Sequence, residues 1–182
     1  MARKYQTQKE AGIILAVCGV ISGLLSAYVN IPGTELFGVP MLPALFFGLV
    51  LALGIYSWES HNPIPMLIVF VGVAAGWWIA YYVAITLHDP QVRNLLVVIG
   101  LMSGFLGSTF TAAALIIASE DFREERAPLK TVAFGTIAGT LLYFVESGGF
   151  VHGLAVLFVV WQGGMAYIIG RALAYRPLPM TA

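Results

Sequence analysis

The sequence predicts an all-α polytopic membrane protein with six transmembrane helices, and three observations support this fold class. Hydrophobic residues make up 59% of the 182 residues and charged residues only 10%, whereas soluble domains carry roughly 25% charged residues. Six apolar stretches approach or exceed the roughly 20 residues that a helix needs to cross a bilayer core. Turn-forming residues separate these stretches. The predicted spans are 11–30, 40–58, 63–87, 94–119, 128–146 and 151–175.

The first span follows three basic residues, as the apolar core of a signal peptide does. Its length of roughly 20 residues exceeds a signal-peptide core, and no clear small-residue cleavage site follows it, so we predict a retained helix. The turn Ile31-Pro32-Gly33 separates it from the second span, 40–58, which is near the short limit.

The remaining spans are separated by similar breaks. No segment left between them is long enough for a soluble domain, so residues 1–182 are expected to form a single transmembrane domain. The charged segment 119–130 is expected to be a solvated connector. The breaks are Asn62-Pro63, Asp89-Pro90, Ala127-Pro128 and Gly148-Gly149.

Lysine and arginine residues predict the orientation, because cytoplasmic loops carry an excess of both. With the N-terminus inside, eight basic residues lie on the cytoplasmic side and only Arg93 lies on the other. This distribution predicts that both termini are cytoplasmic. The expected location is a bacterial inner membrane. The eight are Arg3, Lys4, Lys9, Arg123, Arg126, Lys130, Arg171 and Arg176.

The two halves of the chain, 11–87 and 94–175, share a pattern that predicts a repeat. Three spans is an odd number, so the second half would be inverted relative to the first. Inverted repeats place a solute path near the midplane, at the interface between the halves. The alternative is that membrane helices share glycine, leucine and serine by composition. The matched pairs are Gly19/Gly100, Ser22/Ser103, Gly23/Gly104, Leu25/Leu106, Phe47/Phe134, Gly48/Gly135, Tyr56/Tyr143, Glu59/Glu146 and Ser60/Ser147.

Two carboxylates end matched helices, and they are the candidate mouth or gating residues. Glu59 and Glu146 would lie at opposite ends of the path. The alternative is an ordinary interfacial carboxylate in contact with water.

No predicted span carries a charge at its centre, which disfavours proton relays and voltage sensors. The residues left inside are neutral, and they suit a small neutral or weakly polar solute. Hydroxyl groups in such helices also bond to carbonyls of their own helix, which is the alternative role. The candidate path-lining residues are Ser22, Ser103, Ser108, Thr136, Gln162, Trp77 and Trp161.

Small residues recur at helical spacing and allow helices to approach closely. The expected use is packing within the bundle, and a homo-oligomer through one such stripe is the alternative. The stripes are Gly19-x3-Gly23, Gly72-x3-Gly76, Ser103-x3-Gly107 and Gly135-x3-Gly139.

The Gly-Ser-Gly first helix, the Phe-Gly second helix and the stretch FGTIAGTLLYFVESGGFVHGLAVLFVVWQGGMAYIIG, residues 134–170, resemble a family of small bacterial inner-membrane proteins of unknown function. Six helices in about 180 residues are also similar to the substrate-binding components of energy-coupling-factor vitamin transporters. Both resemblances imply the fold alone.

These observations predict a channel or facilitator for a small solute or ion. The alternative is a non-transporting membrane subunit, such as a scaffold, sensor or assembly factor. An intramembrane protease is a remote alternative: Ser103 and His152 lie on the spans that carry a rhomboid-type nucleophile and base, but Leu101 stands where that motif wants glycine. We expect no enzymatic activity, cofactor, metal or nucleic acid, and the expected partners are the lipid bilayer and a small solute.

Overall fold

The computed structural model describes residues 8–29, 33–59, 61–88, 95–123, 126–147 and 150–174, without the side chains of residues 146, 147, 150 and 151. Most of these residues are helical, and two short strands form a hairpin. The elements in chain order are α1 (Gln8–Tyr28), β1 (Glu35–Leu36), β2 (Val39–Pro40), α2 (Leu42–Trp58), α3 (Pro63–Leu87), α4 (Leu95–Ala118), α5 (Glu120–Arg123), α6 (Ala127–Gly139), the 3-10 turn η1 (Thr140–Leu142), α7 (Tyr143–Ser147) and α8 (Phe150–Leu173).

Five helical segments of the described chain are long and apolar enough to cross a membrane, which confirms an all-α integral membrane protein. The best-predicted boundaries are those of α3, at residues 63 and 87. The Asn62 side chain accepts a hydrogen bond from the Ile64 N–H at 3.0 Å and caps the helix, and Pro63 suits its first turn. The other long segments are α1, α4, α6 to α7 and α8.

The second predicted span, 40–58, is shorter in the structure. α2 has 17 residues and is about 25 Å long, against about 30 Å for a bilayer core. The residues just before it form an antiparallel hairpin in which Glu35 pairs with Pro40. Phe37 and Gly38 at its tip have φ of 52° and 77°, as a type I′ turn requires. The sequence analysis did not predict this hairpin.

The fifth predicted span, 128–146, is not one continuous α-helix. α6 ends at Gly139, and the 3-10 turn η1 separates it from α7. The Thr140 backbone N–H donates to the Ile137 carbonyl, and the Tyr143 N–H donates to the Thr140 carbonyl, each three residues back. This tighter spacing is that of a 3-10 turn.

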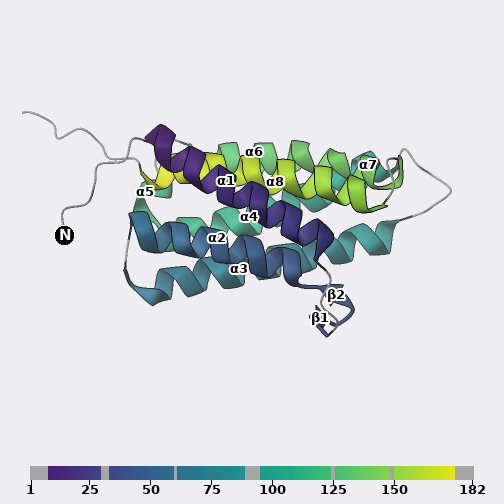
Figure 1. The fold of residues 1–182 in the computed structure, drawn as a ribbon, viewed down its shortest axis with the longest axis horizontal. Helices are drawn as coiled ribbons and strands as arrows, with labels where there is room; N and C mark the ends of the chain where they lie inside the picture. The colour runs from purple at the N-terminus through teal and green to yellow at the C-terminus, as the bar shows by residue number, and fades with distance from the viewer. Residues whose placement is uncertain are drawn as a thin grey trace, which may run out of the picture.

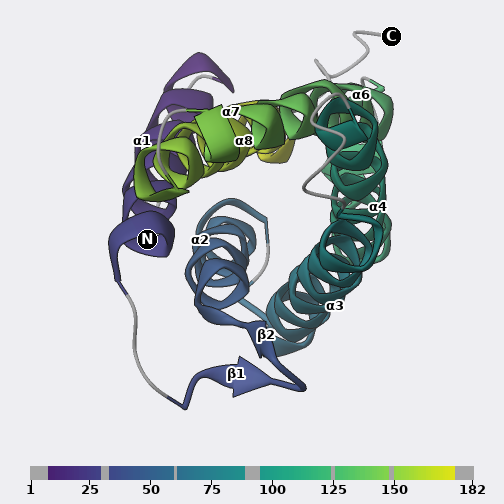
Figure 2. The ribbon, with the colours of Figure 1, turned by 90° about the vertical axis from the view of Figure 1, so that its right-hand side faces the viewer.

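The long helices lie side by side (Figure 1). The hairpin and α7 lie at one end, called the hairpin end below, and α5 lies at the other, called the α5 end. Figure 2 looks at the hairpin end and shows α1, α8, α6, α4 and α3 in an arc, with α2 in its concave side. Neighbours along the arc pack on one another, and α2 packs on α1 and α3.

Glycines set the close approach of helices along the arc. A side chain on Gly19 would meet the Gln162 carbonyl oxygen of α8 at 2.6 Å, and one on Gly100 would overlap the Gly139 carbonyl oxygen of α6. Gly76 faces Gly107 of α4 in the same way. The predicted small-residue stripes therefore pack within this chain. A homo-oligomer through them stays a prediction.

The α5 end of the bundle is filled by an apolar core. Its members come from α1, α2, α3, α4, α5, α6 and α8. The described basic residues also lie at this end, at the starts or ends of their helices or beside α5. The core includes Leu15, Leu51, Ile55, Val69, Leu115, Phe122, Ile169 and Leu173. The described basic residues are Lys9, Arg123, Arg126, Lys130 and Arg171.

Candidate functional site

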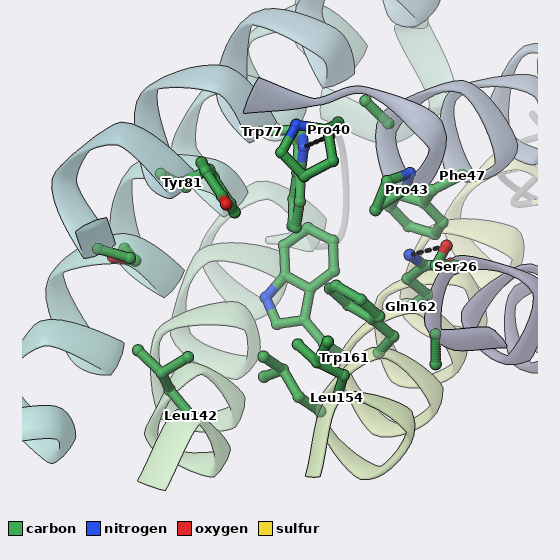
Figure 3. A pocket seen from close by; sticks show the side chains of 18 of the residues that line it. Ser26, Pro40, Pro43, Phe47, Trp77, Tyr81, Leu142, Leu154, Trp161 and Gln162 are labelled. Carbon is green, nitrogen blue, oxygen red and sulfur yellow. Dashed lines mark hydrogen bonds between the residues drawn. The ribbon is translucent and has the colours of Figure 1, made fainter. Parts of the chain in front are cut away.

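The hairpin end of the bundle encloses a cavity of about 770 Å³ between α2 and the arc of helices (Figure 3). Exposed residues form its rim, among them Tyr28 at the end of α1, Glu35 in the hairpin and His88 after α3. Its deepest wall includes the buried residues Phe47 and Val73. The apolar core follows beyond them, so the cavity opens at the hairpin end and is closed towards the α5 end.

Aromatic side chains make up much of the inner wall. Trp77 of α3 meets Phe158 of α8 edge to face, with ring centroids 5.4 Å apart. Phe47 of α2 meets Trp161 of α8 in the same geometry and at the same distance. Tyr81 lies one helical turn from Trp77 towards the rim, with 5.8 Å between ring centroids. Three helices therefore contribute rings to the cavity wall, among them Phe47, Trp77 and Trp161 in Figure 3.

A hydrogen bond holds the hairpin against this wall. The Trp77 indole N–H donates to the Pro40 carbonyl at 2.7 Å (Figure 3). Thr34, Glu35 and Pro40 line the cavity. The segment between the first two predicted spans therefore forms part of the rim, together with Pro40 at the predicted start of the second span.

Gln162 lies on the cavity wall and joins α8 to α1. The oxygen of its side-chain amide accepts a hydrogen bond from the Ser22 hydroxyl at 2.6 Å. The nitrogen of the same side-chain amide donates to Ser26 Oγ at 3.2 Å. Ser26 in turn donates to the Ser22 carbonyl at 2.8 Å. Gln162, Ser22 and Ser26 are 1%, 2% and 9% exposed. In this buried cluster their polar groups bond to one another.

Ser103 of α4 also lies on the wall, and its environment differs. Its hydroxyl oxygen is buried and has no hydrogen-bond partner among the described residues. Buried hydroxyl groups are nearly always bonded. A nucleophilic serine needs a base within hydrogen-bond reach, so this geometry lends no support to the protease alternative. Ser103 lines the cavity, but its buried hydroxyl oxygen is not accessible to a solute there.

Four of the seven predicted path-lining residues line the cavity, namely Ser103, Gln162, Trp77 and Trp161. The other three bond inside the protein wall. Ser22 binds Gln162, Ser108 donates to the Gly104 carbonyl at 2.6 Å, and Thr136 donates to the Val132 carbonyl at 2.7 Å.

Of the two predicted mouth carboxylates, the structure describes Glu59, which does not line the cavity. Glu59 follows α2 at the α5 end, where it accepts a hydrogen bond from the Glu120 N–H at 2.7 Å. It thereby joins the end of α2 to the start of α5. The side chain of Glu146 lies outside the described residues. Glu35 occupies the rim instead, and nothing in the apolar pattern of the sequence singled it out.

Sequence reasoning also missed the ring partners Phe47, Tyr81 and Phe158. Phe47 appeared only as a repeat match, and the other two lie within long apolar runs. Aromatic residues in such runs face lipid, core or cavity according to helix rotation, which the sequence does not reveal. The available signal was the density of aromatic residues in the segment around Trp77.

Replacing Gln162 with leucine is expected to lower the free energy of unfolding by about 1 kcal/mol, because interhelical bonds in membranes are worth roughly 0.6–1.7 kcal/mol. Leucine keeps the size of the side chain and removes both bonds to α1. Unfolding in mixed micelles, followed by circular dichroism, measures the change. Ser108→Ala is the control, because the shortest bond of that hydroxyl is to its own helix. An equal loss in both variants would contradict the bridging role.

No family model, curated protein or solved structure matches this sequence.

Proposed function

We propose that the protein is a facilitator that takes a small, mainly apolar solute into the cavity and passes it across the membrane. The single observation that carries the proposal is the cavity itself, which is about 770 Å³ in volume. Binding sites for small molecules are concave, mostly apolar and about 300–1,000 Å³ in volume. A non-transporting scaffold predicts a packed interior instead, and the cavity argues against that alternative.

The lining supports a solute in preference to an ion. Inside the rim, the described wall carries rings, aliphatic groups and neutral polar groups. Charged groups in a membrane interior are costly unless they are paired. A bare cation would find neither carboxylates nor a ring of carbonyl oxygens there.

The closed floor supports a carrier in preference to an open channel. Phe47 and the apolar core stand between the cavity and the α5 end. A solute would therefore leave on the far side only after helices move. Broken helices at a solute site are common in carriers, and η1 lies on the cavity wall through Leu142.

The proposal includes the topology. We assign α2 as a sixth span, because it runs from the hairpin end to the α5 end beside the longer helices (Figure 1). The gathering of described basic residues at the α5 end supports a cytoplasmic location for that end. Both termini are then cytoplasmic, and the cavity faces the opposite side of the bacterial inner membrane.

The inverted repeat is supported by helix pairing and not by the matched glycines. In a repeat of the halves 11–87 and 94–175, α1 corresponds to α4 and α8 corresponds to α3. The α1–α8 pair therefore corresponds to the α4–α3 pair, and both pairs pack closely. Gly19 and Gly100 nevertheless face helices that this correspondence does not relate, α8 and α6. The repeat is therefore proposed for helix order alone.

Filling the cavity is expected to stop transport. A side chain on Gly107 would lie 3.5 Å from Ala80 Cβ and 3.7 Å from Trp161 Cζ2, so Gly107→Leu would project into the deep part of the cavity. We expect initial uptake into proteoliposomes to fall at least about tenfold, since a filled pocket excludes its ligand. Met102→Leu, at a residue 46% exposed on the same helix, is the matched control.

The uptake panel contains radiolabelled benzamide, acetate, ammonium and rubidium. Benzamide is expected to enter faster than into empty liposomes, and rubidium is not. If no member enters faster than into empty liposomes, the facilitator proposal fails. If rubidium alone does so, the protein is an ion channel.

A further inference from the structure

We infer that the hairpin lies in the headgroup layer of the membrane and anchors the mouth of the cavity there, with Phe37 at its tip in lipid. The inference rests on the topology proposed above, in which the hairpin end is a membrane surface. It goes beyond the proposed function, because it assigns a partner, the phospholipid interface, to a surface outside the cavity. Three features support it: the depth of the hairpin, its direction and the chemistry of its tip.

The length of α2 sets the depth of the hairpin. Trp58 ends α2 at the α5 end, and tryptophan is enriched at the boundary of a membrane. From there α2 rises about 25 Å to Leu42, and the hairpin lies just before Leu42 in the chain. A hydrocarbon core about 30 Å thick therefore ends near the hairpin. Open strand edges do not occur in contact with hydrocarbon, so the hairpin belongs to the headgroup layer.

The hairpin projects sideways from the bundle. Figure 1 shows it at the side of the bundle, and Figure 2, which looks along the helices, shows it outside α2 and between α1 and α3. The Trp77 indole N–H fixes it to α3 by donating to the Pro40 carbonyl. The Met41 N–H closes its base by donating to the Thr34 carbonyl at 3.1 Å. A hairpin fixed in this direction at the level of the headgroups lies along the membrane surface.

The two faces of the hairpin have different surroundings. Glu35 pairs with Pro40, and both residues line the cavity. Successive residues of a strand point to opposite faces, so the exposed side chain of Leu36 points away from the cavity. Phe37 at the tip is 86% exposed and does not line the cavity. The hairpin therefore has one face on the cavity and an apolar edge on the outside of the protein.

The residue at the tip is unusual for a turn in water. The first central position of a type I′ turn favours asparagine, aspartate or glycine, and here it is Phe37 with φ of 52°. A bulky side chain is strained in this backbone conformation. Because the ring is so exposed, contacts with described residues do not offset the strain. Insertion into the headgroup and acyl boundary offsets it, since phenylalanine and leucine are favoured there.

The surface around the tip is apolar and carries no basic group among the described residues of the hairpin. Leu25 and Tyr28 of α1 and Tyr82 of α3 are exposed near the same end of the bundle, so the lipid-facing surface continues from both helices. The segment TELFGVP, residues 34–40, contains Glu35 but neither lysine nor arginine. Anionic lipids attract basic segments, so this anchor depends on apolar contact and not on anionic lipid.

Nitroxide labels on single cysteines test the inference. The full chain is placed in phosphatidylcholine nanodiscs, and Cys18→Ser is the background for labels at Phe37→Cys or Glu35→Cys. Electron paramagnetic resonance measures collisions of each label with oxygen, which concentrates in lipid, and with a nickel chelate, which stays in water. Glu35→Cys is the matched control on the cavity rim. A label on Cys18 of the unchanged chain, exposed on α1, is the lipid reference.

We expect collisions with the nickel chelate to be at least about fivefold rarer at residue 37 than at residue 35, because apolar surroundings exclude a polar complex. Oxygen collisions should be more frequent at residue 37. A label at Leu36→Cys follows the hairpin when Phe37 is changed. Phe37→Ser should raise its nickel collisions roughly threefold, and Phe37→Leu should leave them unchanged. Phosphatidylglycerol in the nanodiscs should alter none of these values.

The outcomes separate the inference from the proposed function. If the nickel chelate reaches residue 37 as readily as residue 35 while Cys18 is shielded, the inference is overturned and the topology stands. If residue 37 is shielded from both oxygen and nickel, a protein partner or a second copy covers the tip, and lipid is not the occupant. If the nickel chelate also reaches Cys18, α1 does not lie in the membrane, and the proposed function fails with the inference.

Discussion

Replacing Gly139 with alanine is expected to lower the free energy of unfolding by about 3 kcal/mol, at the upper end of the range for overpacked sites. A side chain at this position would overlap the Gly100 carbonyl oxygen, and one at Gly100 would overlap that of Gly139. Both obstacles are backbone atoms. They cannot turn aside as a flexible side chain does, so α4 and α6 would have to separate. Unfolding in mixed micelles measures the loss.

Gly107→Ala is the matched control for this prediction. Gly107, on α4, is buried like Gly139. A side chain on Gly107 would meet its neighbours only at ordinary contact distances of 3.5 Å and more. Alanine is the better helix former by about 1 kcal/mol, so the control should match or slightly exceed wild type. Equal stability of the Gly139→Ala and Gly107→Ala variants would show that α4 and α6 are not in close backbone contact.

Replacing Phe47 with alanine is expected to cost about 4 kcal/mol of stability, within the range for buried aromatic side chains. The ring is 1% exposed and packs edge to face on Trp161. Its removal would also deepen the cavity towards Leu51. The stability loss is measured as before, and benzamide uptake into proteoliposomes should fall, because Trp161 loses the ring that positions it.

The control for Phe47 is a phenylalanine of the same chain that faces outwards. Phe105 on α4 is 49% exposed, so in the proposed topology its ring contacts lipid. Phe105→Ala should cost less than about 1 kcal/mol, because exposed positions outside packed features have small effects. A comparable loss in both variants would contradict the placement of Phe47 at the cavity floor.

Much of the fold was predictable because lipid imposes a simple pattern. Apolar length identified the five long spans, and Asn62-Pro63 marked the start of α3 because a capping side chain and a proline favour that position. The hairpin was harder to predict. Its strands are two residues each. A positive φ is unusual for a phenylalanine, so Gly38 was the residue at the tip whose type indicated a turn. The turn η1 packs on α4, and the local sequence does not encode that contact.

The candidate site was predictable only in part, because polarity alone does not say which way a side chain faces. Ser22, Ser103 and Ser108 are alike in sequence. One bonds to Gln162, one lies unpaired on the cavity wall and one bonds to its own helix. Tertiary packing assigns these roles. The gating role predicted for Glu59 stays a prediction, and in the structure its carboxylate accepts a hydrogen bond from the Glu120 N–H.

The pairing of α1 with α8 has a consequence for the synthesis of the protein. α1 packs on α8 from Gly12, beside Tyr167, to Gly23, against Phe158. α1 therefore leaves the ribosome well before α8, its most extensive partner among the described helices. Until α8 is made, the glycine face of α1 lacks that partner, and this side of the arc cannot form. A chain truncated before α8 would keep the α3–α4 contact and lose the α1–α8 contact.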